Sequence, residues 1–349
     1  MCNVNRHYFL ALGCMLIVSQ SIYPSVSSNA KNDLICETHV SMGTLFKSCV
    51  YSNGRTSLQA VSDLRSAFSV IDDIDGWMSD WKPHTELSQI NAAAGVRGVV
   101  VRDELFDILQ TALQISRKTG GAFDPTFNAF WGLYNFKPGH QRAPTEAEIA
   151  ERLPLVDYKS VRIDKEKRQV FLVKKGMKLG LGGIGQGYAV ERMSQKLRRL
   201  YTAGYVDGSG DTYFWGRKPN GELWTTGIRD PRNKEKIILR IHATDVAITT
   251  CGDDEKFFFQ GNRRIHHIID PKNGKPAQLS RQTTIIAATP TMADAYDTAT
   301  FVLGPARSKP LVESLGMEGV FVDDNGVTLT AGLVPIDTPW GRVYQLRRN

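Results

Sequence analysis

The sequence predicts an α+β fold, because its helices gather in the first half of the chain and strands fill most of the second half. Apolar residues recur at helical spacing between Leu58 and Met78 and again between Leu105 and Ile115. A third helix is expected after residue 185, and the chain then becomes a long run of strands with an antiparallel pattern. A doubly wound parallel sheet would require strands and helices in alternation, so the α+β class is favoured.

Each expected element has a local reason. The double glycine at 120–121 ends the second helix, and Thr145 with Glu148 forms a capping box for a short helix that ends near Pro154. Segments rich in β-branched and aromatic residues, bounded by turn residues, are expected to be strands. These expected strands cover 39–51, 160–164, 169–173, 177–181, 204–216, 223–230, 236–242, 246–254, 255–260, 265–270, 283–288, 320–324, 327–332 and 344–348, with late helices at 293–303 and 306–315.

Length and composition are those of an ordinary globular protein. The 349 residues provide ample core for one large domain or two smaller ones, and 42% of them are hydrophobic and 23% charged. The net charge of +7 comes from scattered Lys and Arg, without a long basic run or interleaved aromatics. A nucleic-acid partner is therefore not expected, and the charge favours at most a mild attraction for anionic ligands.

The first 30 residues predict a secretory signal peptide. A short basic start is followed by an apolar run over residues 8–18, and Ser28-Asn29-Ala30 fits a small-x-small cleavage site. We therefore expect a signal peptide at 1–30 and a mature domain at 31–349, located in the periplasm of a Gram-negative cell. No stretch of the mature chain is long and apolar enough to span a membrane. An uncleaved signal segment would keep the protein at the membrane.

The cysteines are few. Cys14 lies inside the apolar run, which continues past it, so a lipid anchor at this position is disfavoured. After cleavage only Cys36, Cys49 and Cys251 remain. The first two could pair in an oxidising compartment, which would leave one thiol over. Three cysteines at these spacings predict neither a disulfide scaffold nor a zinc site.

A glycine-rich stretch from Gly180 to Gly185 matches G-x-G-x-x-G and precedes the third helix. With Asp207 at the end of the next strand, it has the pattern of a dinucleotide-binding βαβ unit. The run of strands that follows argues against that fold. A purely structural turn is a second interpretation. A third is a loop whose bare backbone N–H and C=O groups approach a phosphate or a cation.

The segment 291–304 carries hard oxygen donors. In a helix, Asp294 and Thr298 lie four residues apart on one face, with Asp297 beside them. Two carboxylates and a hydroxyl suit Mg²⁺ or Ca²⁺. An equally weighted alternative is a solvated first turn, where the helix dipole favours aspartate.

Two further stretches are weaker signals on their own. The segment 266–276, HHIIDPKNGKP, predicts a strand followed by a turn that Asn273-Gly274 closes, as at the end of a hairpin. The segment 121–126, GAFDPT, has residues that are typical of a turn.

Together and in order, these stretches resemble the FAD:protein FMN transferases, the ApbE-like flavin transferases. The resemblance covers nearly the whole mature chain and implies an α+β fold of two subdomains, with mostly antiparallel sheets and FAD in a cleft between the subdomains. The matching segments are MGT at 42–44, MSDWKPHTELSQIN at 78–91, TGGAFDPT at 119–126, LGLGGIGQGYAVE at 179–191, TTCGDDEKFF at 249–258, HIIDPKNGKP at 267–276 and ADAYDTATFVLG at 293–304.

The resemblance also implies which residues would form the site. Mg²⁺ would be held by Asp294, Asp297, the Thr298 hydroxyl and the carbonyl of Gly183. His267 would border the nucleotide, and it and Asp294 are the catalytic candidates for accepting a proton, with Asp297 beside them. The residues implied in FAD binding are Met42, Trp81, Ala122, Phe123, Asp124, Gly180, Gln186 and Ile269.

Four positions depart from the family pattern. Gly180 and Gln186 stand where the family usually has Asp and a Lys or Glu, which removes a hydrogen-bond acceptor for the nucleotide and an electrostatic contact with FAD. Cys251 replaces a serine, and Ser209 replaces the first of two paired glycines. The helix with the expected metal ligands is intact.

The reaction implied is phosphoryl transfer. A Thr or Ser hydroxyl of a target protein, for example a periplasmic electron-transfer subunit, would attack the FMN-side phosphorus of FAD, and AMP would leave. Mg²⁺ would bridge the pyrophosphate and stabilise the leaving phosphate. The alternatives are a non-catalytic FAD carrier, an FAD pyrophosphatase and, less favoured, an NAD(P)-dependent oxidoreductase that uses the Gly180–Gly185 loop.

Overall fold

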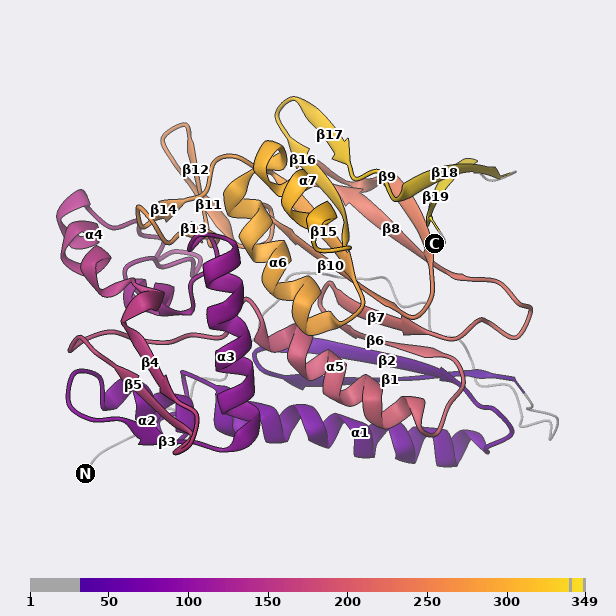
Figure 1. Cartoon of the computed structure of the whole chain (residues 1–349). Helices are drawn as coiled ribbons and strands as arrows, with labels where there is room; N and C mark the ends of the chain where they lie inside the picture. The colour runs from indigo at the N-terminus through magenta and orange to yellow at the C-terminus, as the bar shows by residue number, and fades with distance from the viewer. Residues whose placement is uncertain (1–31, 339–340, 348–349) are drawn as a thin grey trace.

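A computed structural model describes residues 32–338 and 341–347, so the predicted signal peptide lies outside the described residues. Helices and antiparallel strands are mixed, which confirms the α+β class (Figure 1). The α-helices are α1 (Ser57–Met78), α2 (Glu86–Ala92), α3 (Asp103–Lys118), α4 (Glu146–Arg152), α5 (Gly185–Arg198), α6 (Pro290–Leu303) and α7 (Pro305–Ser314).

The central element is an eight-stranded sheet with strand order β1-β2-β6-β7-β10-β15-β16-β17. Each neighbouring pair in it is antiparallel. Its strands are β1 (Leu34–Ser41), β2 (Thr44–Tyr51), β6 (Gly204–Gly208), β7 (Asp211–Trp215), β10 (Val246–Gly252), β15 (Gln282–Ala287), β16 (Glu318–Asp323) and β17 (Gly326–Leu329). The pairing of β2 with β6 joins the N-terminal hairpin to the strands that follow α5.

Smaller sheets surround this one. A four-stranded sheet has the order β18-β19-β9-β8, a three-stranded sheet has the order β3-β5-β4, and two separate hairpins are β11–β12 and β13–β14. Their bounds are β3 (Val99–Val100), β4 (Val161–Asp164), β5 (Gln169–Leu172), β8 (Trp224–Asp230), β9 (Asn233–Ala243), β11 (Phe257–Gln260), β12 (Arg263–His266), β13 (Ile269–Asp270), β14 (Lys275–Pro276), β18 (Leu333–Thr338) and β19 (Gly341–Leu346).

The core has two layers, one on each face of the large sheet. Helices α1, α5 and α6 cover one face (Figure 1). The four-stranded sheet covers the other face. Successive side chains of a strand point to opposite faces, so Ala247 of β10 joins the helix side and Ile248 joins the sheet side. This packing fixes α5 and α6 side by side over β7, β10 and β15.

Four strand predictions are wrong. Residues 39–51 and 204–216 each form two strands of a hairpin, because turns with positive φ at Met42-Gly43 and Ser209-Gly210 divide them. The other two also have a local cause. Residues 177–181 form no strand, because side-chain amides take the place of a neighbouring strand: Asn91 bonds both the N–H and the C=O of Leu179 at 2.7 and 2.9 Å. The segment 265–270 is two strands, not one. The break lies at His267, whose N–H donates to Lys256 O at 3.1 Å and closes the β11–β12 hairpin.

The dinucleotide-binding alternative is also wrong. The strand before the glycine loop, β5, belongs to the antiparallel three-stranded sheet, while β6 after α5 belongs to the large sheet. The two strands flanking the loop and helix are therefore not parallel neighbours, as a βαβ unit requires. The loop still precedes a helix, as predicted.

The N-terminal hairpin is linked covalently. Cys36 and Cys49 lie directly opposite each other on β1 and β2 and form a disulfide, and Cys251 is a free thiol.

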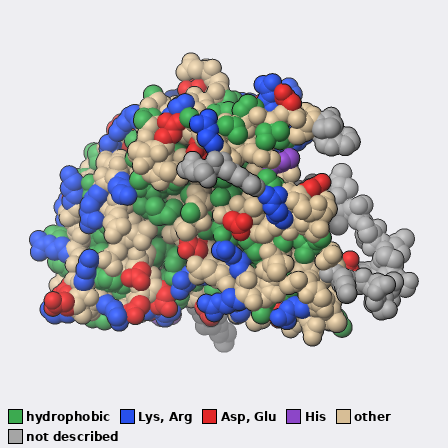
Figure 2. Space-filling view, turned by 45° about the vertical axis from the view of Figure 1, so that its right-hand side comes forward, with side chains coloured by type: hydrophobic (Ala, Val, Ile, Leu, Met, Phe, Trp, Pro, Cys, Tyr) green, Lys and Arg blue, Asp and Glu red, His purple; other side chains and the backbone are tan. Residues whose placement is uncertain are grey.

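On the face in Figure 2, Lys and Arg are interspersed with Asp and Glu, as the scattered positions in the sequence led us to expect. Among the described residues, every helix is too short or too polar to cross a bilayer.

Candidate active site

The glycine loop and α6 meet at two points where a side chain would not fit. The N–H of Gly187 donates to Asp294 Oδ2 at 2.9 Å. A Cβ on Gly187 would lie 2.3 Å from Pro290 O, and one on Gly183 would lie 2.9 Å from Thr298 Oγ1. These glycines are therefore needed to bring the start of α5 against α6. The same approach places Gly183 beside the predicted ligands of α6.

The two aspartates of α6 are buried. Asp294 is 6% exposed and Asp297 is 1% exposed, so the alternative of a solvated first turn is wrong. Burial raises the pKa of Asp294 to about 7 and the pKa of Asp297 well above its usual range. Asp297 Oδ1 accepts from Thr283 Oγ1 of β15 at 2.5 Å, whereas its Oδ2 is buried without a hydrogen-bond partner among the described residues.

A third buried carboxylate belongs to the same group and was missed in the sequence. Asp211 opens β7 and is 7% exposed. Burial raises its pKa, and the charges of Asp294 and Asp297 raise it further. The available signal in the sequence was the Ser209-Gly210 pair just before it; in the structure both residues take positive φ, at 54° and 114°.

A second missed residue is Cys251, which was noted only as a departure from the family serine. Its Sγ lies 3.7 Å from Asp297 O, to which it donates, and 3.3 Å from Thr283 Oγ1. Burial raises the pKa of this thiol, which therefore stays protonated. The thiol helps to hold the backbone of α6 at Asp297.

The donors at this junction fit a hard divalent cation. Within residues 32–338 and 341–347, no group of three His, Cys, Asp or Glu side chains is placed to hold a metal ion. The predicted set needs only two such side chains, because its other donors are the Thr298 hydroxyl and the Gly183 carbonyl. The unpartnered Oδ2 of Asp297 and the raised pKa values of three buried acids are features that a cation would relieve, because it would stabilise the charged carboxylates.

His267 lies between β12 and β13, not at the start of a strand. Its Nδ1 is buried and has no hydrogen-bond partner among the described residues. Burial lowers its pKa to about 4, so the ring is neutral at pH 7. The neighbouring His266 is a core residue, with Nε2 bonded to Ala277 O at 2.8 Å and its ring against Phe301 of α6 at 5.6 Å.

Three of the residues implied in FAD binding contact the glycine loop or the segment that supports it. Met42 occupies the β1–β2 turn with φ of 50°, and its Cε would lie 3.6 Å from a Cβ on Gly185. Phe123 Cε2 would lie 3.4 Å from a Cβ on Gly183. Ala122 packs in one cluster with residues of α6, and with Ile268, which precedes Ile269.

Two other residues implied in FAD binding, Asp124 and Trp81, contact other parts of the chain. The carboxylate of Asp124 is buried and accepts from the N–H groups of Thr126 and Tyr158 at 2.8 and 3.0 Å, so it shapes the segment that enters the 3-10 turn η1 (Pro125–Phe130). Trp81 is 69% exposed and meets Trp131 edge to face, with ring centroids 4.0 Å apart. Two large exposed aromatic rings in contact offer a surface for a planar ligand.

The structure shows what surrounds Gly180 and Gln186, the two residues that depart from the family pattern around the glycine loop. A Cβ on Gly180 would lie 2.9 Å from the side chain of Asn128, which donates to Asp80 Oδ2 at 2.8 Å and to Leu179 O. An aspartate at Gly180 would therefore displace Asn128. Gln186 donates from Nε2 to Gly208 O at 3.3 Å. Its amide thus ties α5 to the end of β6.

Of the predicted residues, the structure brings Gly183, Asp294, Asp297 and Thr298 together, with Phe123 against the same loop. Trp81, His267 and Ile269 come from other elements: Trp81 precedes α2, His267 lies between β12 and β13, and Ile269 opens β13. A glycine loop facing buried acids, outside any βαβ unit, is the arrangement expected of an ApbE-like flavin transferase. A sequence model described as the ApbE family matches residues 42–321, and the chain belongs to this family.

Named relatives and, separately, solved structures agree with the assignment to the ApbE family. The chain is 31% identical over 312 residues to the FAD:protein FMN transferase of Treponema pallidum, covering 84% of this chain and 86% of the relative. It is 26% identical to the FAD:protein FMN transferase of Escherichia coli K12, covering 80% and 84%. The crystal structure of the ApbE protein from Thermotoga maritima has a TM-score of 0.78 at 29% identity, covering 86% of this chain and 97% of that one. The flavinyl transferase ApbE of Pseudomonas stutzeri, at 24% identity and a TM-score of 0.76, supports the fold alone.

Proposed function

We propose that this protein transfers FMN from FAD to a Thr or Ser hydroxyl of a target protein and releases AMP. The observation that carries the proposal is the junction of the glycine loop with the buried Asp294, Asp297 and Thr298 of α6. It is supported by the similarity to proteins named FAD:protein FMN transferase over more than three quarters of both chains.

We propose Mg²⁺ as the cation of this site, held by Asp294, Asp297, the Thr298 hydroxyl and the Gly183 carbonyl. When bound, it would neutralise charge on the pyrophosphate and on the departing AMP. The chain's own residues fix the geometry: Thr283 and Cys251 orient Asp297, and the N–H of Gly187 orients Asp294. FAD would lie between the glycine loop and the Trp81 side of the site.

His267 is the better of the two candidates for accepting the hydroxyl proton. Its neutral ring has a free Nδ1, whereas Asp294 would be engaged as a metal ligand. A base with a pKa of about 4 accepts a proton from a hydroxyl only as that hydroxyl attacks, so its contribution lies in the transition state.

The test is to incubate the purified protein with FAD or NAD, with and without Mg²⁺, and to analyse the bound nucleotide and the products. FAD binding with Mg²⁺-dependent AMP release that requires a protein acceptor supports the proposal. Bound FAD without AMP would identify a carrier, and AMP with free FMN in the absence of acceptor would identify a pyrophosphatase. NAD binding without FAD binding would contradict all three.

We further propose that the protein works in an oxidising compartment outside the cytoplasm, the periplasm of a Gram-negative cell, on a target such as an electron-transfer subunit. The Cys36–Cys49 disulfide supports this location, because such bonds persist where thiols are not kept reduced. Fractionation of the source cells that finds an uncleaved cytosolic product would contradict it.

A further inference from the structure

The β11–β12 hairpin stands apart from the large sheet and connects two points of the candidate site. Among the described residues its strands pair only with each other. The chain enters it after Cys251, which contacts Asp297 O, and leaves it at His267, whose N–H donates to Lys256 O. The hairpin therefore projects from the rim of the site.

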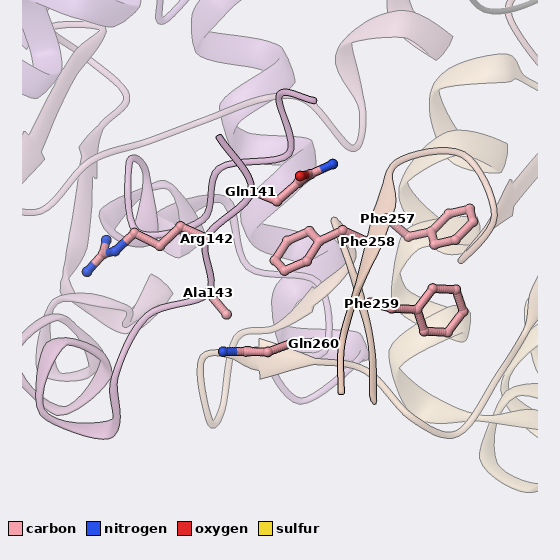
Figure 3. Close-up of a pocket in the computed structure, with 7 residues that line it drawn as sticks. All are labelled: Gln141, Arg142, Ala143, Phe257, Phe258, Phe259 and Gln260. Carbon is pink, nitrogen blue, oxygen red and sulfur yellow. The ribbon is translucent and has the colours of Figure 1, made fainter. Parts of the chain in front are cut away.

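A hollow of about 510 Å³ lies between one face of this hairpin and residues 141–143 (Figure 3). Phe258 and Gln260 point toward residues 141–143, and Phe257 and Phe259 point to the other side. The walls of the hollow thus carry an apolar ring and amide groups, a mixture that suits an extended peptide. They also include Arg142, whose charge is paired with Glu148.

The second wall also originates at the candidate site. It belongs to the segment that follows Asp124 and η1, and it is tied back to the turn after β13 by Tyr134, whose hydroxyl donates to Gly274 O at 2.7 Å. Phe136 of this segment meets Phe258 of the hairpin, with ring centroids 5.7 Å apart. The two walls are thereby held in a fixed relation to each other and to His267.

The hollow face of the hairpin carries a cation without an ion-pair partner. Arg263 lies directly opposite Gln260 in the antiparallel register and so shares its face. No described residue forms an ion pair with Arg263, whereas Arg264 on the other face is 3.5 Å from Asp253. Arg263 therefore lies next to Gln260, beside the hollow, and an acidic side chain there would complement it.

We propose that this hollow receives the segment of the target protein that carries the acceptor hydroxyl, in extended form and with an acidic side chain next to Arg263. This inference rests on the proposed function. The peptide groups of the segment meet the amides of Gln141 and Gln260, and its direction along the hairpin carries the hydroxyl toward His267. Unpaired strand edges and pockets for alternate side chains are the common means of binding extended peptides.

The test uses the mature enzyme, FAD, Mg²⁺ and the protein of the source cell that acquires covalent flavin, purified as acceptor. Arg263→Glu reverses the charge beside the hollow. Arg240→Glu is the matched control, because Arg240 is an exposed cation of β9, in the four-stranded sheet, and has no ion-pair partner among the described residues either. We expect Arg263→Glu to raise the KM for the acceptor about tenfold, with kcat and the KM for FAD unchanged, and Arg240→Glu to change none of them.

Two results would overturn the inference while leaving the proposed function intact: an acceptor KM unchanged in Arg263→Glu, or one raised equally in both variants. In the wild type the acceptor KM should also rise with salt, and this dependence should weaken in Arg263→Glu. If no protein of the source cell acquires covalent flavin, the proposed function is wrong and this inference fails with it.

Discussion

Asp294→Asn should make the metal-free protein more stable at pH 8. Burial raises the pKa of Asp294 from 3.8 to about 7, so the folded state holds this proton more tightly than the unfolded state. The stability that the proton contributes is complete below pH 4 and is lost as the pH rises to 7. At 1.36 kcal/mol per pKa unit, the loss is about 4 kcal/mol, an upper figure because Asp211 and Asp297 share the same surroundings.

The asparagine removes the charge and keeps an oxygen for the N–H of Gly187. In EDTA, urea unfolding should therefore show the variant to be several kcal/mol more stable than the wild type at pH 8, with the difference vanishing near pH 4. Mg²⁺ should narrow this difference: at a hundredfold excess over Kd it stabilises the wild type by about 2.7 kcal/mol, and the variant by much less.

Asp73→Asn is the matched control, since Asp73 lies exposed on α1, and its effect should stay within about 0.5 kcal/mol at every pH. The reasoning is refuted if metal-free Asp294→Asn is no more stable than the wild type at pH 8. The metal assignment is refuted if Mg²⁺ stabilises the two proteins equally.

Further predictions concern the same site and its frame. Thr298→Val should raise the Mg²⁺ concentration that half-maximal FMN transfer requires, but by less than Asp294→Asn does, because the lost ligand is neutral. A Mg²⁺ titration of the rate checks this. Replacing both Cys36 and Cys49 by Ala should cost about 2–4 kcal/mol in urea unfolding, and unchanged stability would show that the disulfide contributes nothing. Gly187→Ala should lower Tm clearly, whereas Gly182→Ala, where a Cβ meets open space, should not. At saturating Mg²⁺, which keeps Asp294 ionised, the rate of transfer should show no step near pH 6.5, because burial lowers the pKa of His267 to about 4.

Local patterns predicted the helices and some of the site. The stripe from Leu58 to Met78 gave α1, and the Thr145–Glu148 capping box is present at α4. Helical spacing alone placed Asp294 and Thr298 on one face of α6, since residues four positions apart lie one above the other on a helix.

Contacts between distant segments could not be predicted in this way. Asp211 reaches Asp294 because β7 and β10 pair in the large sheet beneath α6, and nothing near Asp211 in the sequence specifies that pairing. Residues 177–181 have the composition of a strand, but Asn91 supplies the hydrogen bonds that a neighbouring strand would have supplied. The orientation of the Asp297 carboxylate likewise depends on Thr283, which belongs to β15.

The most direct test of the central claim is the ratio of AMP released to flavin bound covalently. The mature enzyme is incubated with FAD, Mg²⁺ and proteins of the source cell, AMP is quantified by chromatography, and the modified residue is located by mass spectrometry. We predict one AMP for each FMN attached to a Thr or Ser, and a loss of both products together in Asp294→Asn. AMP accompanied by free FMN, or FAD bound without AMP, would contradict the assignment of protein flavinylation to this chain.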